Sequence, residues 1–202
     1  MSSAWRLISF GSRVPAEYGE AAQKLAEQCR SLGIDCFVPI IDFDGAERKH
    51  IVLSKPTFIL KQLRENPEPT LWLDCDTALE ALPALPWQKE WDVGFLPNTL
   101  RPGLLRRIGL RRPSRRWENP VCGFAVAFRP TEPNFHFLEI WKYLCDWPDL
   151  APGGDHKRMC WARRMTDLRE VNIASHLQGA VVRDKGKAKE HDLHGMQGLD
   201  LR

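Results

Sequence analysis

The sequence predicts an α/β fold of three layers, in which a mostly parallel central sheet is flanked by helices. Residues 5–10 and 36–41 are apolar runs that are too short for helices and are typical of buried strands. Between them, residues 18–32 carry apolar side chains at steps of three and four, which form one face of a helix, and Gly33 follows where that helix is expected to end. A strand, a helix and a strand in succession predict two parallel strands joined by a crossover.

The same alternation continues along the rest of the chain. Residues 51–64 suit a helix that begins at Pro56, because proline is accepted in a first helical turn. Residues 70–73 form a third apolar strand, which leads directly into Asp74. Further strands are expected over residues 91–96, 121–128 and 180–182, and further helices over residues 137–145 and 155–164.

Length and composition predict one domain followed by a tail. The chain has 202 residues, of which 43% are apolar, and this is enough for one sizeable core. We expect residues 1–182 to form that domain and the polar residues 183–202 to form a tail or a lid. A net charge of +3 and a pI of 8.6 are too small to indicate a nucleic-acid partner.

The sequence predicts neither a signal peptide nor a membrane span. The first residues lack an apolar core, and no apolar run reaches the roughly 18 residues that a span requires. A cytoplasmic protein is therefore expected. Six cysteines occur without any C-x-x-C pair, so buried, reduced thiols are favoured over zinc ligands or disulfides.

A pair of carboxylates, Asp74 and Asp76, follows the strand over residues 70–73 at an end where open α/β sheets bind ligands. Within a strand, side chains two residues apart point to the same side, so the two charges would lie close together. Such a pair is unfavourable unless a cation neutralises it, and Mn²⁺ or Mg²⁺ suits carboxylates completed by water and phosphate oxygens. The alternative is that one Asp caps the next segment and the other is solvated.

Several motifs occur in a characteristic order around this pair. Residues 55–59 (KPTFI) precede residues 70–77 (TLWLDCDT), and residues 91–95 (WDVGF) and 119–128 (NPVCGFAVAF) follow. This order resembles the nucleotide-sugar glycosyltransferases of the A-type fold, a Rossmann-like fold in which K-P-x-F precedes an apolar strand and D-x-D. A helix carrying Phe137 to Trp141 and then Gly154-Asp155-His156 extends the resemblance, which covers roughly residues 5–178.

The resemblance implies a metal-dependent transferase that moves a sugar from a UDP-sugar or another nucleotide-diphosphate sugar to the hydroxyl of a sugar, lipid-linked or protein acceptor. Mn²⁺ or Mg²⁺ on Asp74 and Asp76 would bridge the two donor phosphates. Asp76 would be the direct ligand, whereas Asp74 would contact the ribose or the sugar, or reach the metal through water. His194 is a candidate third ligand. Asp155 is the candidate catalytic residue, either orienting the sugar or acting on the acceptor.

The resemblance also implies a set of donor-binding residues. The loop after the first strand would meet the base or ribose, and Lys55 would approach the phosphates or the sugar. The donor-binding candidates are Phe10, Gly11, Ser12, Arg13, Lys55, Asp74 and Gly123.

Residues 101–116 contain seven arginines and allow three interpretations. They form a solvated surface loop, an acceptor-side loop that grips an acidic group, or a basic patch that contacts the anionic inner surface of a membrane. Nucleic acid is disfavoured, because no aromatic residues interleave with the arginines. Trp117 is a candidate for stacking on a sugar, whereas Trp141 and Trp161, at helical spacing, are expected in the core.

A second carboxylate pair and other functions compete with this interpretation. Asp42 and Asp44 follow the second strand, although a turn before Gly45 accounts for them. A haloacid-dehalogenase-like phosphatase also uses D-x-D at a strand end, but Ala78 stands where that motif has threonine. A nucleotidyltransferase would need a glycine-rich loop after the first strand. A non-catalytic nucleotide-binding module of the same fold is the remaining alternative.

Overall fold

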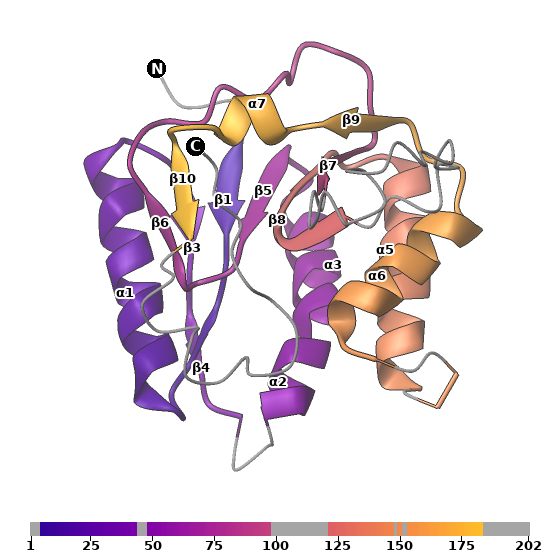
Figure 1. Cartoon of the computed structure of the whole chain (residues 1–202), viewed down its shortest axis with the longest axis horizontal. Coiled ribbons are helices and arrows are strands. Elements are labelled where there is room, and N and C mark those ends of the chain that lie inside the picture. The colour runs from indigo at the N-terminus through magenta and orange to yellow at the C-terminus, as the bar shows by residue number, and fades with distance from the viewer. Residues whose placement is uncertain (1–4, 44–47, 98–120, 148, 151–152, 184–202) are drawn as a thin grey trace, which may run out of the picture.

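The computed structural model describes residues 5–43, 48–97, 121–147, 149–150 and 153–183, and the structural statements below concern these residues. The predicted α/β fold with a mostly parallel central sheet is confirmed: six strands form a sheet between helical layers (Figure 1). None of the helices in these ranges has the length and apolar character needed to cross a membrane. The expected tail lies outside these ranges, except for Arg183, which belongs to a strand.

The central sheet has the order β3-β1-β5-β8-β7-β9. Every neighbouring pair is parallel except the two that involve β8, which runs antiparallel to both β5 and β7. Its strands are β1 (Arg6–Ile8), β3 (Cys36–Phe37), β5 (Thr70–Leu73), β7 (Val93–Pro97), β8 (Val121–Phe128) and β9 (Glu170–Asn172).

Helices cover both faces of this sheet (Figure 1). The first face carries α1 (Ala16–Ser31) and the short α7 (Ala174–Leu177). The opposite face carries α2 (Arg48–Leu53), α3 (Lys55–Glu65), α5 (Glu132–Asp146) and α6 (Asp155–Met165).

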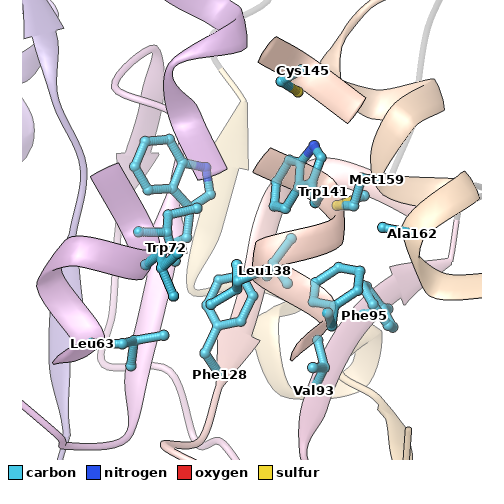
Figure 2. Packing of buried hydrophobic residues seen from close by; sticks show 14 of the residues in the cluster. Leu63, Trp72, Val93, Phe95, Phe128, Leu138, Trp141, Cys145, Met159 and Ala162 are labelled. Carbon is cyan, nitrogen blue, oxygen red and sulfur yellow. The ribbon is translucent and has the colours of Figure 1, made fainter. Parts of the chain in front are cut away.

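Alternation along the strands separates the two halves of the core. Leu71 and Leu73 of β5 pack in the cluster that includes α1, whereas Trp72 points to the other side. The second cluster contains Phe128 of β8 with apolar residues of α3, α5 and α6. Figure 2 shows Trp141 of α5 together with Met159 and Ala162 of α6 in this cluster.

The expected end of the first helix is confirmed at Gly33. This residue has φ +67°, a conformation that glycine adopts without steric cost, and the N–H of Ile34 donates to the carbonyl of Cys29 at 2.9 Å. Close packing also explains Gly11, because a Cβ there would lie 2.4 Å from the carbonyl oxygen of Tyr18. Glycine therefore lets the chain after β1 approach α1.

Each of the first two predicted strands is divided into two. β2 (Gly11–Ser12) follows β1, and β4 (Ile40–Ile41) follows β3, with parallel pairing between β2 and β4. Pro39 explains the division, because it accepts a hydrogen bond from the N–H of Gly11 but has no N–H to return.

The predicted helix over residues 51–64 is divided by Ser54 into α2 and α3, with Pro56 in the first turn of α3 as expected. The expected strand near the C-terminus is confirmed as β10 (Val181–Arg183), which pairs antiparallel with β6 (Thr77–Leu79). Sequence patterns did not indicate β6, β9 or α7, which are all short.

The expectation for Trp161 is wrong. Its side chain is 48% exposed, because α6 buries a face formed by Arg158, Met159 and Ala162, and Trp161 lies off that face. Trp141 is fully buried, as expected. All six cysteines are free, but the expectation of buried thiols holds only for Cys29, Cys122 and Cys145, because Cys36, Cys75 and Cys160 are partly buried.

Asp92 connects the start of β7 to the start of β9 through hydrogen bonds with Arg169. It is 1% exposed, and its carboxylate accepts hydrogen bonds from the backbone N–H of Arg169 at 2.9 Å and from the guanidinium of Arg169 at 3.1 and 3.2 Å. Burial alone would raise the pKa of Asp92, but these hydrogen bonds outweigh it and hold the pKa below its ordinary value.

We expect Asp92→Asn to lower the free energy of unfolding by about 2 kcal/mol at pH 7, because Arg169 loses its charged acceptor. The native pKa of Asp92 is depressed, so its stabilisation is complete above the unfolded pKa of about 4 and is lost as the pH falls through the native pKa. Urea unfolding over this pH range should therefore show the gap between the two proteins narrowing as the pH is lowered.

Glu90→Gln is the matched control. Glu90 contacts the same guanidinium at 3.0 Å, but its side chain is 87% exposed, so its ion pair with Arg169 is screened by solvent. We expect little change in the free energy of unfolding. Equal losses in the two variants would contradict the importance of the buried carboxylate.

Candidate active site

Asp74 and Asp76 lie in the turn that connects β5 to β6. The N–H of Asp74 donates to the carbonyl of Phe124 at 2.8 Å, and the N–H of Thr77 donates to the carbonyl of Asp74 at 3.0 Å. Asp74 continues the hydrogen bonding of β5 to β8, whereas Asp76 lies in the turn, so the alternation of a strand does not set their relative orientation. Both residues are partly buried, at the carboxyl end of a central strand.

The ammonium of Lys55, the first residue of α3, joins two carboxylates. Its Nζ lies 2.8 Å from Oδ1 of Asp74 and 2.9 Å from Oδ2 of Asp155, and it also donates to the carbonyl of Gly123 at 3.4 Å. The Lys55 side chain is only 8% exposed. The structure thus brings Asp74, Asp155 and Gly123 together around Lys55. All four residues were predicted from the sequence.

The charges of this cluster explain how a buried lysine is tolerated. Burial alone would lower the pKa of Lys55, but attraction to Asp155 and then to Asp74 outweighs burial, so the pKa lies above its ordinary value and the ammonium stays charged. Two carboxylates thus contact one ammonium, and Asp76 adds a third carboxylate in the same turn as Asp74. The formal charge that remains is negative and suits a bound cation.

Two tryptophans position the carboxylates. The Nε1–H of Trp72 donates to Oδ1 of Asp74 at 3.0 Å, and the ammonium of Lys55 lies 5.4 Å from the centre of the Trp72 ring. The Nε1–H of Trp141 donates to the backbone carbonyl of Asp155 at 3.1 Å. Each indole therefore contributes apolar packing and one hydrogen bond that holds a carboxylate-bearing turn in place.

His156 extends the cluster along α6. Its Nδ1 accepts a hydrogen bond from the N–H of Gly123 at 3.2 Å, which places the proton of the neutral imidazole on Nε2. Burial lowers the pKa of His156. The negative charge of Asp155 raises this pKa, the positive charge of Lys55 lowers it, and the negative charge of Asp74 raises it. The net shift is downward, so the ring is neutral at pH 7.

The loop after the first strand is fixed by local contacts. Phe10 is buried in an aromatic cluster, with its ring centre 5.5 Å from that of Trp72. The hydroxyl of Ser12 donates to the carbonyl of Val14 at 2.6 Å. Arg13 is exposed, and its guanidinium lies 3.7 Å from the carboxylate of Asp42. Contact of Phe10, Gly11, Ser12 and Arg13 with a donor stays a prediction.

The described residues fit part of a divalent-metal site. No group of three His, Cys, Asp or Glu side chains within them is arranged to hold a metal by itself. Two carboxylates are nevertheless what Mg²⁺ or Mn²⁺ requires when phosphate and water complete its shell. The hydrogen bonds that Lys55 and Trp72 donate to Asp74 both go to its Oδ1 atom. Burial and then the charges of Asp74 and Asp76 raise the pKa of Cys75 to about 12, so its thiol is neutral.

Several predicted features lie outside the described residues. They are His194, Asp44, Trp117 and the arginine-rich segment 101–116. Other site residues were missed by sequence reasoning. The alternation of side chains in a strand could have indicated Trp72, which stands two residues before Asp74. No local pattern indicated the contacts of Trp141 and His156.

Comparison with solved structures identifies the fold. A glycosyltransferase involved in the glycosylation of the major capsid of PBCV-1 is similar with a TM-score of 0.61 and 13% identity, over 92% of this chain and 95% of that chain. The galactosyltransferase LgtC, in complex with donor and acceptor sugar analogues, is similar with a TM-score of 0.50 and 9% identity, over 83% and 72%. No protein-family model and no curated protein matches the sequence. The chain has the A-type glycosyltransferase fold, as its motif order indicated.

We expect Lys55→Met to lower the free energy of unfolding by about 3 kcal/mol, because removal of the ammonium leaves Asp74 and Asp155 partly buried without their cation. Adding Asp74→Asn and Asp155→Asn to this variant should recover part of the loss. Urea unfolding of the three single variants and of the triple variant measures the coupling between Lys55 and the two carboxylates.

Lys61→Met, on the same helix, is the control. Lys61 is exposed and pairs only loosely with Glu65, at 3.8 Å, so its replacement should change the stability little. If the two lysine substitutions cost the same, or if the added asparagines bring no recovery, the buried ion pairs do not stabilise this site.

Proposed function

We propose that the protein is a metal-dependent glycosyltransferase that moves a sugar from a nucleotide-diphosphate donor to an acceptor hydroxyl. The observation that carries this proposal is the cluster of Lys55, Asp74 and Asp155 at the carboxyl end of β5. Ligands of open α/β sheets bind at this end of the strands. The fold likeness to glycosyltransferases supports the same reaction class.

Asp76 and Asp74 are the residues that would hold Mn²⁺ or Mg²⁺. When bound, the cation would neutralise negative charge that develops on the departing nucleotide diphosphate. Asp74 keeps its place through Lys55 and Trp72, which both donate to Oδ1. The chain thus contributes a carboxylate whose position is set before any ligand arrives.

Lys55 acts in this proposal as a positioning residue. Its ammonium holds Asp155, at the start of α6, close to Asp74, and the Nε1–H of Trp141 donates to the backbone carbonyl of Asp155. Asp155 would then orient the donor sugar or act on the acceptor hydroxyl. The three N–H donors of Lys55 are directed at Asp74, Asp155 and the carbonyl of Gly123, so a donor contact of Lys55 itself would require the ammonium to leave one of these acceptors.

The identity of the donor as UDP-sugar, the contact of residues 101–116 with a membrane and the cytoplasmic location stay predictions. The comparisons give no support to the phosphatase or to the non-catalytic module. The acceptor, a sugar, a lipid-linked group or a protein, likewise stays a prediction.

We expect UDP and Mn²⁺ together, but neither alone, to raise the melting temperature, because Asp74 and Asp76 would hold the metal and the metal would supply the charge that attracts the diphosphate. Asp76→Asn should weaken Mn²⁺-dependent UDP binding at least tenfold, roughly the scale of losses at metal sites. Isothermal titration with UDP at fixed Mn²⁺ gives the affinity.

The rival carboxylate after the second strand provides the comparison. Asp42→Asn removes an exposed carboxylate and should leave Mn²⁺-dependent binding unchanged. If Asp42→Asn abolishes binding while Asp74→Asn and Asp76→Asn retain it, the assignment of the metal pair is wrong. Turnover of p-nitrophenyl phosphate that disappears in Asp74→Asn would instead indicate the phosphatase.

We expect Asp155→Asn to retain UDP binding but to lower the rate of Mn²⁺-dependent nucleotide-sugar hydrolysis or transfer by about 100-fold or more, the usual scale for a catalytic carboxylate. Product formation from a panel of nucleotide sugars measures the rate. Asp146→Asn, at an exposed carboxylate of α5 paired with Lys142, should leave it unchanged. Equal rates in Asp155→Asn and the native protein would remove Asp155 from the chemistry.

A further inference from the structure

A hollow of about 340 Å³ lies along α6, beside the candidate active site. The described residues that line it are His156, Lys157, Cys160, Trp161 and Arg164. They all belong to α6. Lys157, Trp161 and Arg164 are exposed, whereas His156 and Cys160 are partly buried and Cys160 packs against the core. The hollow is therefore open to solvent and borders the core.

Trp161 gives the hollow an aromatic surface. Almost half of this side chain is exposed, and the guanidinium carbon of Arg164 lies 5.1 Å from the ring centre. A cation held over an indole by cation–π attraction places a forked hydrogen-bond donor next to an apolar plane. An aromatic plane suits the C–H face of a pyranose ring, and the fork suits a carboxylate or a phosphate.

The other residues that line the hollow are basic or neutral. Lys157 adds a second basic side chain, His156 is neutral at pH 7, and no carboxylate belongs to the described lining. The described lining of the hollow therefore carries net positive charge, whereas the cluster around Asp74 carries net negative charge because carboxylates outnumber cations there. A metal-bound diphosphate suits the acidic cluster, whereas an anionic group without a metal suits the hollow.

His156 connects the two places. It lines the hollow and follows Asp155 in the chain. Its Nδ1 accepts a hydrogen bond from the N–H of Gly123, and the carbonyl of Gly123 accepts a hydrogen bond from Lys55. A ligand seated on Trp161 would thus lie along the same helix as the candidate catalytic carboxylate.

We propose that this hollow binds the acceptor, a saccharide that carries a negatively charged group, either a phosphate or a carboxylate. The proposal rests on the transferase function proposed above. Trp161 contacts the sugar ring, and Arg164 and Lys157 bind the anionic group. His156, the neighbour of Asp155 in the chain, would lie between this acceptor and the candidate active site.

A glycan array with neutral, uronic acid-containing and phosphorylated saccharides tests the hollow directly. We expect the native protein to bind acidic saccharides, and Trp161→Ala and Arg164→Gln each to weaken this binding at least about tenfold, as expected for loss of a charged or aromatic contact. The array also separates the two sources of charge, since phosphate-bearing and carboxylate-bearing saccharides occupy separate spots.

Two matched substitutions are the controls. Trp147→Ala removes an exposed tryptophan at the end of α5, and Arg30→Gln removes an exposed arginine in the last turn of α1, on the other face of the sheet. Both should bind the array as the native protein does. Equal binding by Trp161→Ala and Trp147→Ala would overturn the proposal, as would neutral saccharides binding as tightly as acidic ones.

The melting-temperature shift by UDP with Mn²⁺, measured on the same native sample, separates the two proposals. A retained shift without saccharide binding contradicts the acceptor hollow and leaves the transferase intact. Saccharide binding without any shift contradicts the transferase and with it the assignment of the hollow as an acceptor site.

Discussion

One buried ammonium connects the elements that form the candidate site. Lys55 stands at the start of α3, and its three partners come from the turn after β5, from β8 and from the start of α6. Removing an ammonium from water is costly unless opposite charges and hydrogen bonds replace the solvent, and here two carboxylates and a carbonyl do so. The need to satisfy this charge therefore constrains how the four elements approach one another.

The reversed strand β8 makes this meeting possible. Because β8 runs antiparallel to β5, its first half lies beside the carboxyl end of β5, where Leu73 pairs with Ala125. Gly123 then stands next to the Asp74 turn and also within reach of His156. All eight residues of β8 are buried, so this strand belongs to the core while it lines the site.

Local patterns predicted much of the fold but only part of the site. The strand β5, the helix end at Gly33 and the start of α6 depend on short-range periodicity and capping, which are visible in the sequence. The partnership of Lys55 with Asp155 depends on the packing of distant elements, which no local pattern encodes. Helical spacing indicates that Trp161 shares a face with other residues but not which face is covered, and in the structure Asp155 is buried whereas Trp161 is exposed.

The pairing of β10 with β6 places the last described residue, Arg183, far from the first, Trp5. Arg183 pairs with Thr77, the residue after Asp76, so whatever follows Arg183 starts at the edge of the sheet that carries the carboxylates. Trp5, in contrast, precedes β1 and lies at the amino end of the parallel strands. A fluorophore or affinity tag attached after β10 would begin beside the candidate metal ligands, whereas one attached before β1 would begin at the opposite end of the sheet.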